Sequence, residues 1–173
     1  QGGGVNYFAL MSYYLMSPLN FLTVFLPSEW LREFLMFSVV IKVACASMFM
    51  AIFLRSLFKK NDFSLVIFGC SFGFCAFFMG YYWNTIWLDT VCITPLVALG
   101  TVKLFTEGKF RLYIVSLALS LLTNYYIGLF ACIFVLLSFI AYNIVKWDGI
   151  KKFATNLLRT GIYSLIAIGL TAF

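Results

Sequence analysis

The 173-residue sequence contains no histidine, and it carries few charged side chains of either sign. The absence of histidine excludes catalysis by Ser-His or Cys-His pairs within these residues. Charged residues make up 10% of the chain, whereas soluble domains usually carry about 25%. A general base in this sequence must therefore be one of the scarce carboxylates, a lysine or a tyrosine.

Apolar side chains dominate instead, with 64% hydrophobic residues, 20% aromatic residues and a mean hydropathy of +1.01. Runs of about 20 apolar residues match the thickness of a bilayer core when they are helical. Peptide groups in lipid must be hydrogen-bonded within their own segment, which favours helices. The composition therefore predicts an integral membrane protein with an all-α fold, a polytopic transmembrane helix bundle whose surroundings are the lipid bilayer.

The five cysteines lie scattered in apolar segments without the spacing of metal ligands. We interpret them as small buried hydrophobic residues, and we expect no metal site and no cofactor. The sequence begins without methionine and stops inside an apolar run. We therefore expect it to be a fragment, the N-terminal portion of a longer protein.

The net charge of +6 comes from basic residues gathered in three short segments, 55–62, 103–111 and 146–152. They form no continuous basic patch, so we expect no nucleic acid partner. Lysine and arginine in short loops between apolar runs are typical of cytoplasmic loops. The turns between these loops should then face outward, which predicts a bacterial plasma membrane protein whose site faces outside.

This alternation of loops divides the sequence into one membrane domain, 1–173. Residues 1–30, interrupted by Ser17-Pro18 and Asn20, should form an interfacial or re-entrant outward segment rather than a single crossing, which stays the alternative. We expect membrane helices over 33–54, 63–82, 88–103, 112–124, 127–145 and 157–173.

The hairpin at 112–145 is short for two crossings, because each arm reaches about 25 Å or less, under the ~30 Å of a bilayer core. Its tip, TNYYIG, should lie recessed below the outer surface. Asn124, Tyr125 and Tyr126 would then line a pocket. A turn that is simply capped by Asn124 is the alternative.

The segment YYWNTIWLDT, residues 81–90, places Asp89 among large aromatic rings at the other outward turn. A carboxylate beside a membrane segment should face a cavity or a partner. Trp83, Asn84 and Trp87 could supply stacking faces and an amide for a sugar. Interfacial anchoring by the aromatic rings and helix N-capping by Asp89 are the alternatives.

Lys42 lies near the middle of the helix expected at 33–54, where an ammonium is costly to bury. It should point into the bundle and bind an anionic ligand such as a lipid phosphate, or pair with an acid absent from this sequence. Asp89 could be its partner only if its own helix carries it deeper. Gly69 and Gly73 should allow close helix packing.

Three motifs in this order, GGGVNYFALMSYYLMSPLN, YYWNTIWLDTVCITPLVALG and TNYYIGLF, resemble the bacterial YfhO family of polytopic membrane proteins. The resemblance covers essentially the whole sequence. Families of this kind resemble the GT-C class of membrane glycosyltransferases. The resemblance implies transfer of a sugar from a polyprenyl-phosphate carrier to a cell-envelope acceptor such as lipoteichoic acid.

In such enzymes the main catalytic aspartate usually follows the first membrane helix, which would place it before Gln1. Asp89 is then the candidate catalytic residue of this sequence, with an auxiliary role in binding or positioning. The candidate substrate-binding residues are Lys42, Trp83, Asn84, Trp87, Asn124, Tyr125 and Tyr126. A membrane transporter or lipid flippase is the alternative function, and a non-catalytic scaffold is a third.

Overall fold

The computed structural model describes Gly4, Leu10 and residues 14–171, and within these residues the chain is helical without strands. The predicted all-α bundle is confirmed. The helices are η1 (Asn20–Phe25), η2 (Ser28–Trp30), α2 (Leu31–Phe58), α3 (Ser64–Gly73), α4 (Ala76–Gly80), α5 (Thr85–Glu107), α6 (Arg111–Thr123), α7 (Tyr125–Val145) and α8 (Ile150–Gly169).

Three helical segments are long and apolar enough to cross a membrane, namely Ser28–Phe58, Thr85–Glu107 and Tyr125–Val145. Helix α6 is apolar but has only 13 residues, a length of about 20 Å. The membrane location predicted from composition agrees with these spans.

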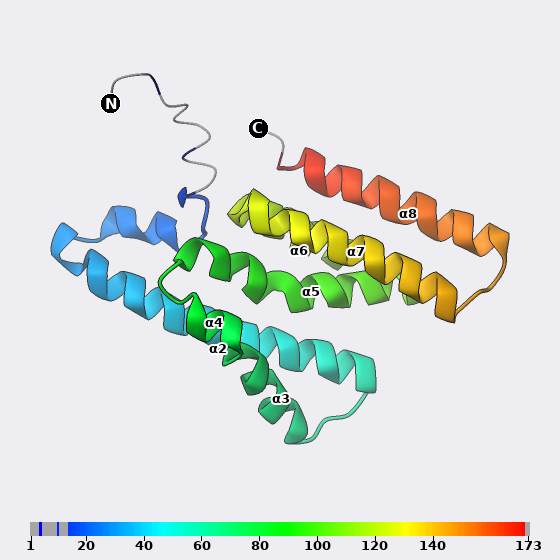
Figure 1. The fold of residues 1–173 in the computed structure, drawn as a ribbon, viewed down its shortest axis with the longest axis horizontal. Helices are drawn as coiled ribbons and strands as arrows, with labels where there is room; N and C mark the ends of the chain where they lie inside the picture. Colours follow the sequence, from blue (N-terminus) through cyan, green and yellow to red (C-terminus); the bar gives the residue numbers. More distant parts are fainter. Residues whose placement is uncertain (1–3, 5–9, 11–13, 172–173) are drawn as a thin grey trace.

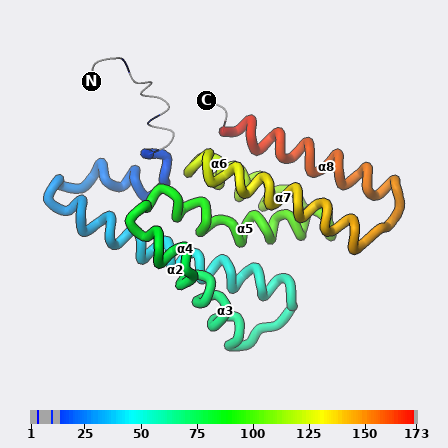
Figure 2. The backbone as a smooth tube through the Cα atoms, viewed as in Figure 1, coloured from blue at the N-terminus to red at the C-terminus, as the bar shows by residue number. Residues whose placement is uncertain are grey.

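Helix α5 lies at the centre of the bundle, with α2, α3 and α4 on one side and α6, α7 and α8 on the other (Figure 1). The backbone trace shows that α3 and α4 together run back along α2, and that α5, α6, α7 and α8 then run in alternating directions (Figure 2). The loops after α2, α5 and α7 thus gather at one end, which we call the basic end. The turns at residues 81–84 and 124 lie at the opposite end, which we call the aromatic end.

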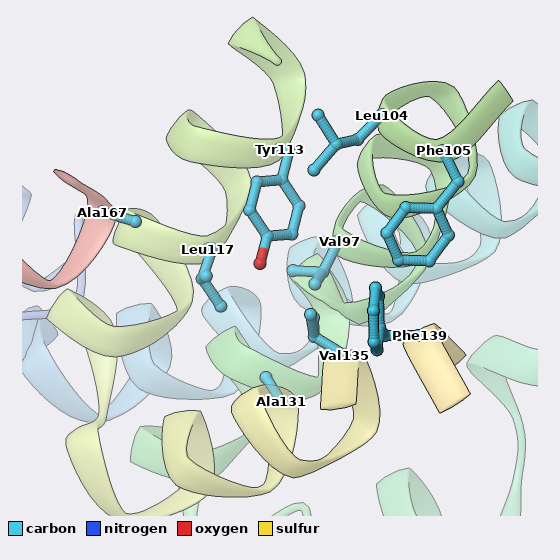
Figure 3. Close-up of a cluster of buried hydrophobic side chains, with 9 residues drawn as sticks. All are labelled: Val97, Leu104, Phe105, Tyr113, Leu117, Ala131, Val135, Phe139 and Ala167. Carbon is cyan, nitrogen blue, oxygen red and sulfur yellow. The ribbon is translucent and has the colours of Figure 1, made fainter. Parts of the chain in front are cut away.

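Two apolar clusters hold the layers together. The first joins α5, α6, α7 and α8, and Figure 3 shows side chains from all four helices interlocking, with Tyr113 fully buried among them. The Tyr113 hydroxyl lies 2.6 Å from Ser164 Oγ on α8, so its polar end is satisfied. The second cluster joins α2 to α4 and α5 around Ala46, Phe78 and Leu88.

Close packing of α2 on α3 depends on glycine, as the sequence predicts. A Cβ atom at Gly73 would lie 2.1 Å from Ser47 Oγ and 2.9 Å from the Val43 carbonyl oxygen. At Gly69 it would lie 2.6 Å from the Ser47 carbonyl oxygen. Only glycine lets the two backbones approach this closely.

The continuous helix expected over 63–82 is wrong, because the chain leaves the helix between α3 and α4. Cys75 adopts an extended conformation with φ −66° and ψ 163°. Gly73, a poor helix former, is the last residue of α3 and is held against α2. The break turns α4 toward the buried cluster around Phe78.

Two helix starts also differ from the expected ones. Helix α5 begins at Thr85 rather than at residue 88, with Asn84 preceding it. Helix α8 begins at Ile150 rather than at residue 157, because Gly149, at φ 92°, ends the loop directly before the lysines. Lys151 and Lys152 are therefore exposed residues of the first turn of α8.

The expectation for residues 1–30 falls partly outside the described residues. From residue 14 onward the chain turns at Pro18 and Leu19 and continues through the short helices η1 and η2 into α2. The backbone N–H of Asn20 donates a hydrogen bond to the Ser17 carbonyl at 2.9 Å across this turn.

Candidate functional site

Lys42 and Asp89 form a buried ion pair between α2 and α5. The Lys42 ammonium lies 2.8 Å from Asp89 Oδ2, and the two side chains are 3% and 8% exposed. Lys42 also donates a hydrogen bond to the Thr85 carbonyl at 2.8 Å. Thr85 lies in the first turn of α5, so this hydrogen bond also links α2 to the start of α5.

The earlier start of α5 explains this pairing, which was the less favoured of the sequence interpretations. Since α5 begins at Thr85, Asp89 lies in its second turn, below the helix end. The alternative that Asp89 caps α5 is therefore wrong. Lys42 finds its acid within this sequence, so the expected need for an acid elsewhere is wrong as well.

The tip of the α6–α7 hairpin lies at the level of Asp89. The hydroxyls of Thr90 on α5 and Thr123 on α6 lie 3.1 Å apart. Thr90 Oγ1 also donates to the Ser120 carbonyl at 3.2 Å. This register places Asn124, the residue after Thr123, about one turn or 6 Å inside the start of α5.

Asn124 is the single residue between α6 and α7, and it is fully buried. Its side-chain oxygen accepts the Ile127 amide at 3.0 Å, which caps α7. The turn capped by Asn124, which was the alternative interpretation of the sequence, is therefore present. Its side-chain nitrogen has no hydrogen-bond partner among the described residues. Because Asn124 is buried and caps α7, it is not a surface ligand in the structure.

Aromatic side chains from two separate turns meet above the ion pair. The rings of Tyr81 and Trp87 lie 5.6 Å apart, and those of Trp87 and Tyr126 lie 6.4 Å apart. Trp83 extends the group from Tyr81 at 6.3 Å and is 68% exposed. We call Tyr81, Trp83, Trp87 and Tyr126 the aromatic rim.

The remaining sequence candidates lie around this rim. Asn84 is half-buried at the start of α5, where its backbone N–H donates to the Tyr81 carbonyl at 2.9 Å and its side chain makes no capping bond. Tyr125 is 56% exposed and begins α7. The structure thus brings Trp83, Trp87 and Tyr126 together and leaves Tyr125 at the edge.

A groove of about 310 Å³ runs beside the ion pair between α2, α5 and α6. Its polar members are Lys42, Asp89 and Ser116, and the other lining side chains are nearly all apolar. The groove is lined by Pro18, Leu19, Ile41, Lys42, Cys45, Phe49, Asp89, Cys92, Ile93, Leu96, Leu112, Val115, Ser116 and Leu119.

Sequence reasoning missed this groove, although its helical spacing is visible in hindsight. Cys45 follows Lys42 by three residues, and Cys92 follows Asp89 by three. Residues three apart share a helix face, so both cysteines had to lie beside the charged pair if the pair formed. Cys45 and Cys92 pack in one apolar cluster, as small hydrophobic residues do.

The described residues contain no cluster of histidine, cysteine, aspartate and glutamate that could hold a metal ion. The polar chemistry of this site consequently rests on one ammonium, one carboxylate, hydroxyls and amides. An apolar groove with a few convergent polar groups is the usual form of a binding site for an amphiphilic molecule.

Comparison with known proteins gives one result. No curated protein and no solved structure matches the sequence. The family model described as "Bacterial membrane protein YfhO" matches residues 1–173, the whole length of the sequence. The resemblance carried by the three motifs is thereby confirmed, and the chain belongs to the YfhO family of bacterial membrane proteins.

Proposed function

We propose that this chain contributes to a membrane glycosyltransferase. The enzyme would move a sugar from a polyprenyl-phosphate carrier to a cell-envelope acceptor, such as lipoteichoic acid, on the outer face of the plasma membrane. The observation that carries the proposal is the buried Lys42–Asp89 pair, which lines an apolar groove and lies just inside the aromatic rim.

Each part of the site suits one part of a lipid-linked sugar. The apolar groove suits the hydrocarbon chain of the carrier. The aromatic rim offers ring faces on which a sugar can stack, and Asn84 offers an amide for its hydroxyls. The basic loops at the opposite end support an outward aromatic end, since such loops are typical of the cytoplasmic side.

Lys42 is suited to the phosphate. An ammonium has three protons to donate, and the Thr85 carbonyl and Asp89 Oδ2 account for two of them. The third proton can serve a ligand in the groove that Lys42 lines. In the transfer, the acceptor oxygen bonds to the anomeric carbon, the bond to the carrier phosphate breaks, and its electron pair leaves with the phosphate. Lys42 would stabilise that departing charge.

Asp89 is suited to an auxiliary role in this scheme. One of its oxygens is occupied by the Lys42 ammonium at 2.8 Å. It would hold Lys42 in place and accept a hydrogen bond from a sugar or acceptor hydroxyl. The proton that the acceptor loses goes to a general base that we do not assign among these residues.

A transporter or lipid flippase is the second candidate, because a charged pair in an apolar groove also suits the passage of a lipid headgroup. A passage needs polar groups that continue inward along the path. The hydroxyls of Thr94 and Thr101, further along α5, are instead occupied by the carbonyls of Thr90 and Val97. This arrangement favours binding at one end over transport through the bundle.

The test replaces Lys42→Met and Asp89→Asn in the full-length protein, singly and together, and measures sugar incorporation into envelope polymer. Both single variants should lose most incorporation. The double variant has no unpaired charge, so it should be more stable than either single variant and still lack incorporation. A double variant with wild-type incorporation would overturn the assignment, because the pair would then be only structural.

The orientation has its own test. Cysteine introduced at the exposed positions Tyr82 and Thr106, in a variant without the native cysteines, is treated in whole cells with a membrane-impermeant thiol reagent. Labelling should occur at position 82 and not at position 106. The reverse pattern would place the aromatic rim inside the cell and remove the outer-face assignment.

A further inference from the structure

A groove larger than the one beside the ion pair lies between α2 and α3, near the basic end. Its volume is about 630 Å³. The apolar walls come from α2 and α3, with Met50, Leu54, Phe58, Leu65, Phe68 and Phe72. On α2 these residues recur every four positions, so they form one continuous stripe about 12 Å long.

The groove is open along one side. Phe58 on α2 and Phe68 on α3 are each 61% exposed although they form opposite walls. Helix α3 packs chiefly on α2. In a membrane, this opening faces hydrocarbon, which suits a single flexible chain lying between the two helices.

One end of the groove is polar and basic. Lys60 and Ser64 line it there, where the loop of residues 59–63 joins α2 to α3. Arg55 and Lys59 are exposed in the same stretch, so three basic residues stand against one acid, Asp62. Asp62 is engaged by the Ser64 hydroxyl.

An acid from another element, Glu107, does not neutralise this end. Glu107, at the end of α5, lies within electrostatic reach of Lys59. Its carboxylate is paired with Lys109 at 2.6 Å. Lys60 has no ion-pair partner among the residues that the structure describes, and it remains a positive charge at the mouth of an apolar groove.

We propose that the groove between α2 and α3 is a binding site for an anionic phospholipid of the surrounding membrane. One acyl chain lies along the Met50–Leu54–Phe58 stripe, and the phosphate lies at Lys60. Charge complementarity and the combination of an apolar trough with a basic mouth favour this occupant. The site is distinct from the groove beside Lys42 and does not depend on the function proposed for it.

The test uses the full-length protein in detergent, with native mass spectrometry to count retained lipids after addition of phosphatidylglycerol or phosphatidylcholine. The wild type should retain one phosphatidylglycerol more firmly than phosphatidylcholine. Lys60→Gln should weaken retention of phosphatidylglycerol about fivefold, as expected for one basic residue near an anionic headgroup. Lys152→Gln, which removes a lysine at the same end but outside the groove, should retain the lipid as the wild type does.

A second pair of variants tests the apolar trough. Ser71→Trp fills the groove from a position whose hydroxyl bonds only its own helix, to the Ile67 carbonyl at 2.9 Å. It should abolish retention of the lipid. Val66→Trp, on the same helix at a 50% exposed position outside the lining, is the matched control and should have no effect.

Two results would overturn the proposal. The first is equal retention of both lipids by the wild type, which would mean that the groove receives an uncharged chain or another helix of the protein. The second is wild-type retention in both Lys60→Gln and Ser71→Trp, which would mean that the anionic lipid binds elsewhere.

Discussion

The two ends of the bundle use the same ionic residues in opposite ways. At the aromatic end Lys42 and Asp89 are buried, at 3% and 8% exposure, between two membrane helices. At the basic end Lys152, in the first turn of α8, pairs with Asp148 of the preceding loop, with side chains 47% and 37% exposed. A buried pair holds two helices in register, whereas an exposed pair contributes little. At the aromatic end the charged pair therefore has a structural or functional role. At the basic end the charged pair faces water and lipid headgroups.

The largest expected effect is the removal of one charge from the buried pair. Lys42→Met leaves Asp89 without its partner inside the bundle, and it frees the Thr85 carbonyl. The expected loss is about 3–5 kcal/mol of unfolding free energy. Thermal unfolding in detergent measures it, and Lys152→Met, at the exposed pair, should unfold like the wild type. Equal behaviour of the two variants would break the comparison.

A smaller effect is expected where α5 and α6 touch, because this contact sets the depth of the hairpin tip at the aromatic end. A Cβ atom at Gly100 would lie 2.7 Å from Tyr113 Cα and 2.8 Å from its amide nitrogen. Gly100→Ala should therefore cost about 1–3 kcal/mol of unfolding free energy.

Gly161 provides the control for this substitution, since nothing lies within 4 Å of a Cβ atom there. Gly161→Ala should leave the unfolding temperature unchanged or raise it, because alanine favours a helix more than glycine. If Gly100→Ala were equally harmless, the close approach of the two helices would not hold the register.

An effect of similar size is expected for the aromatic residues of the two ends. Trp87→Ala removes ring contacts to Tyr81 and Tyr126, each worth about 0.5–1.5 kcal/mol. Trp147→Ala, at the basic end, removes one contact, to Phe153 at 5.9 Å. Thermal unfolding should therefore show a greater loss for Trp87→Ala. Sugar incorporation should fall with Trp87→Ala and stay unchanged with Trp147→Ala.

The smallest effect concerns the pH dependence of the exposed pair. The hydrogen bond from Lys152 lowers the pKa of Asp148, and the nearby lysine charges lower it further. A lowered carboxyl pKa contributes stability above the ordinary pKa, and this contribution is lost as the pH falls through the folded-state pKa. Asp148→Asn should thus differ slightly from the wild type at neutral pH and converge with it once the pH falls below the lowered pKa of Asp148. A difference that grows toward acid pH would contradict the sign of this linkage.

The class of fold and the local packing could be predicted from the sequence. Low charge, long apolar runs and three basic loops predict a helical membrane bundle. The glycines at 69 and 73 predict a close helix contact, and the structure shows that α2 is the partner. These features depend on composition and on residues within one helix. The membership of the YfhO family likewise follows from motifs that the whole sequence carries.

The features that the sequence left undetermined depend on how far each helix is shifted along its neighbour. The ion pair required Asp89 to be one turn inside α5, and a start assigned at residue 88 kept it at the surface. The break at Cys75 lies within an apolar run that has no proline. The rim required Trp87 and Tyr126 to meet across two hairpins, and no local pattern specifies such a meeting.

The short length of α6 affects the membrane beside it. Helix α6 has 13 residues and α7 has 21, a difference of about 12 Å in length. Val115, at 55% exposure, and Leu119, at 38%, show that α6 meets its surroundings directly. Hydrophobic mismatch of this size thins the bilayer locally. Lipid molecules beside α6 would therefore sink toward the midplane, which shortens the distance that a headgroup must travel to reach the level of Asp89.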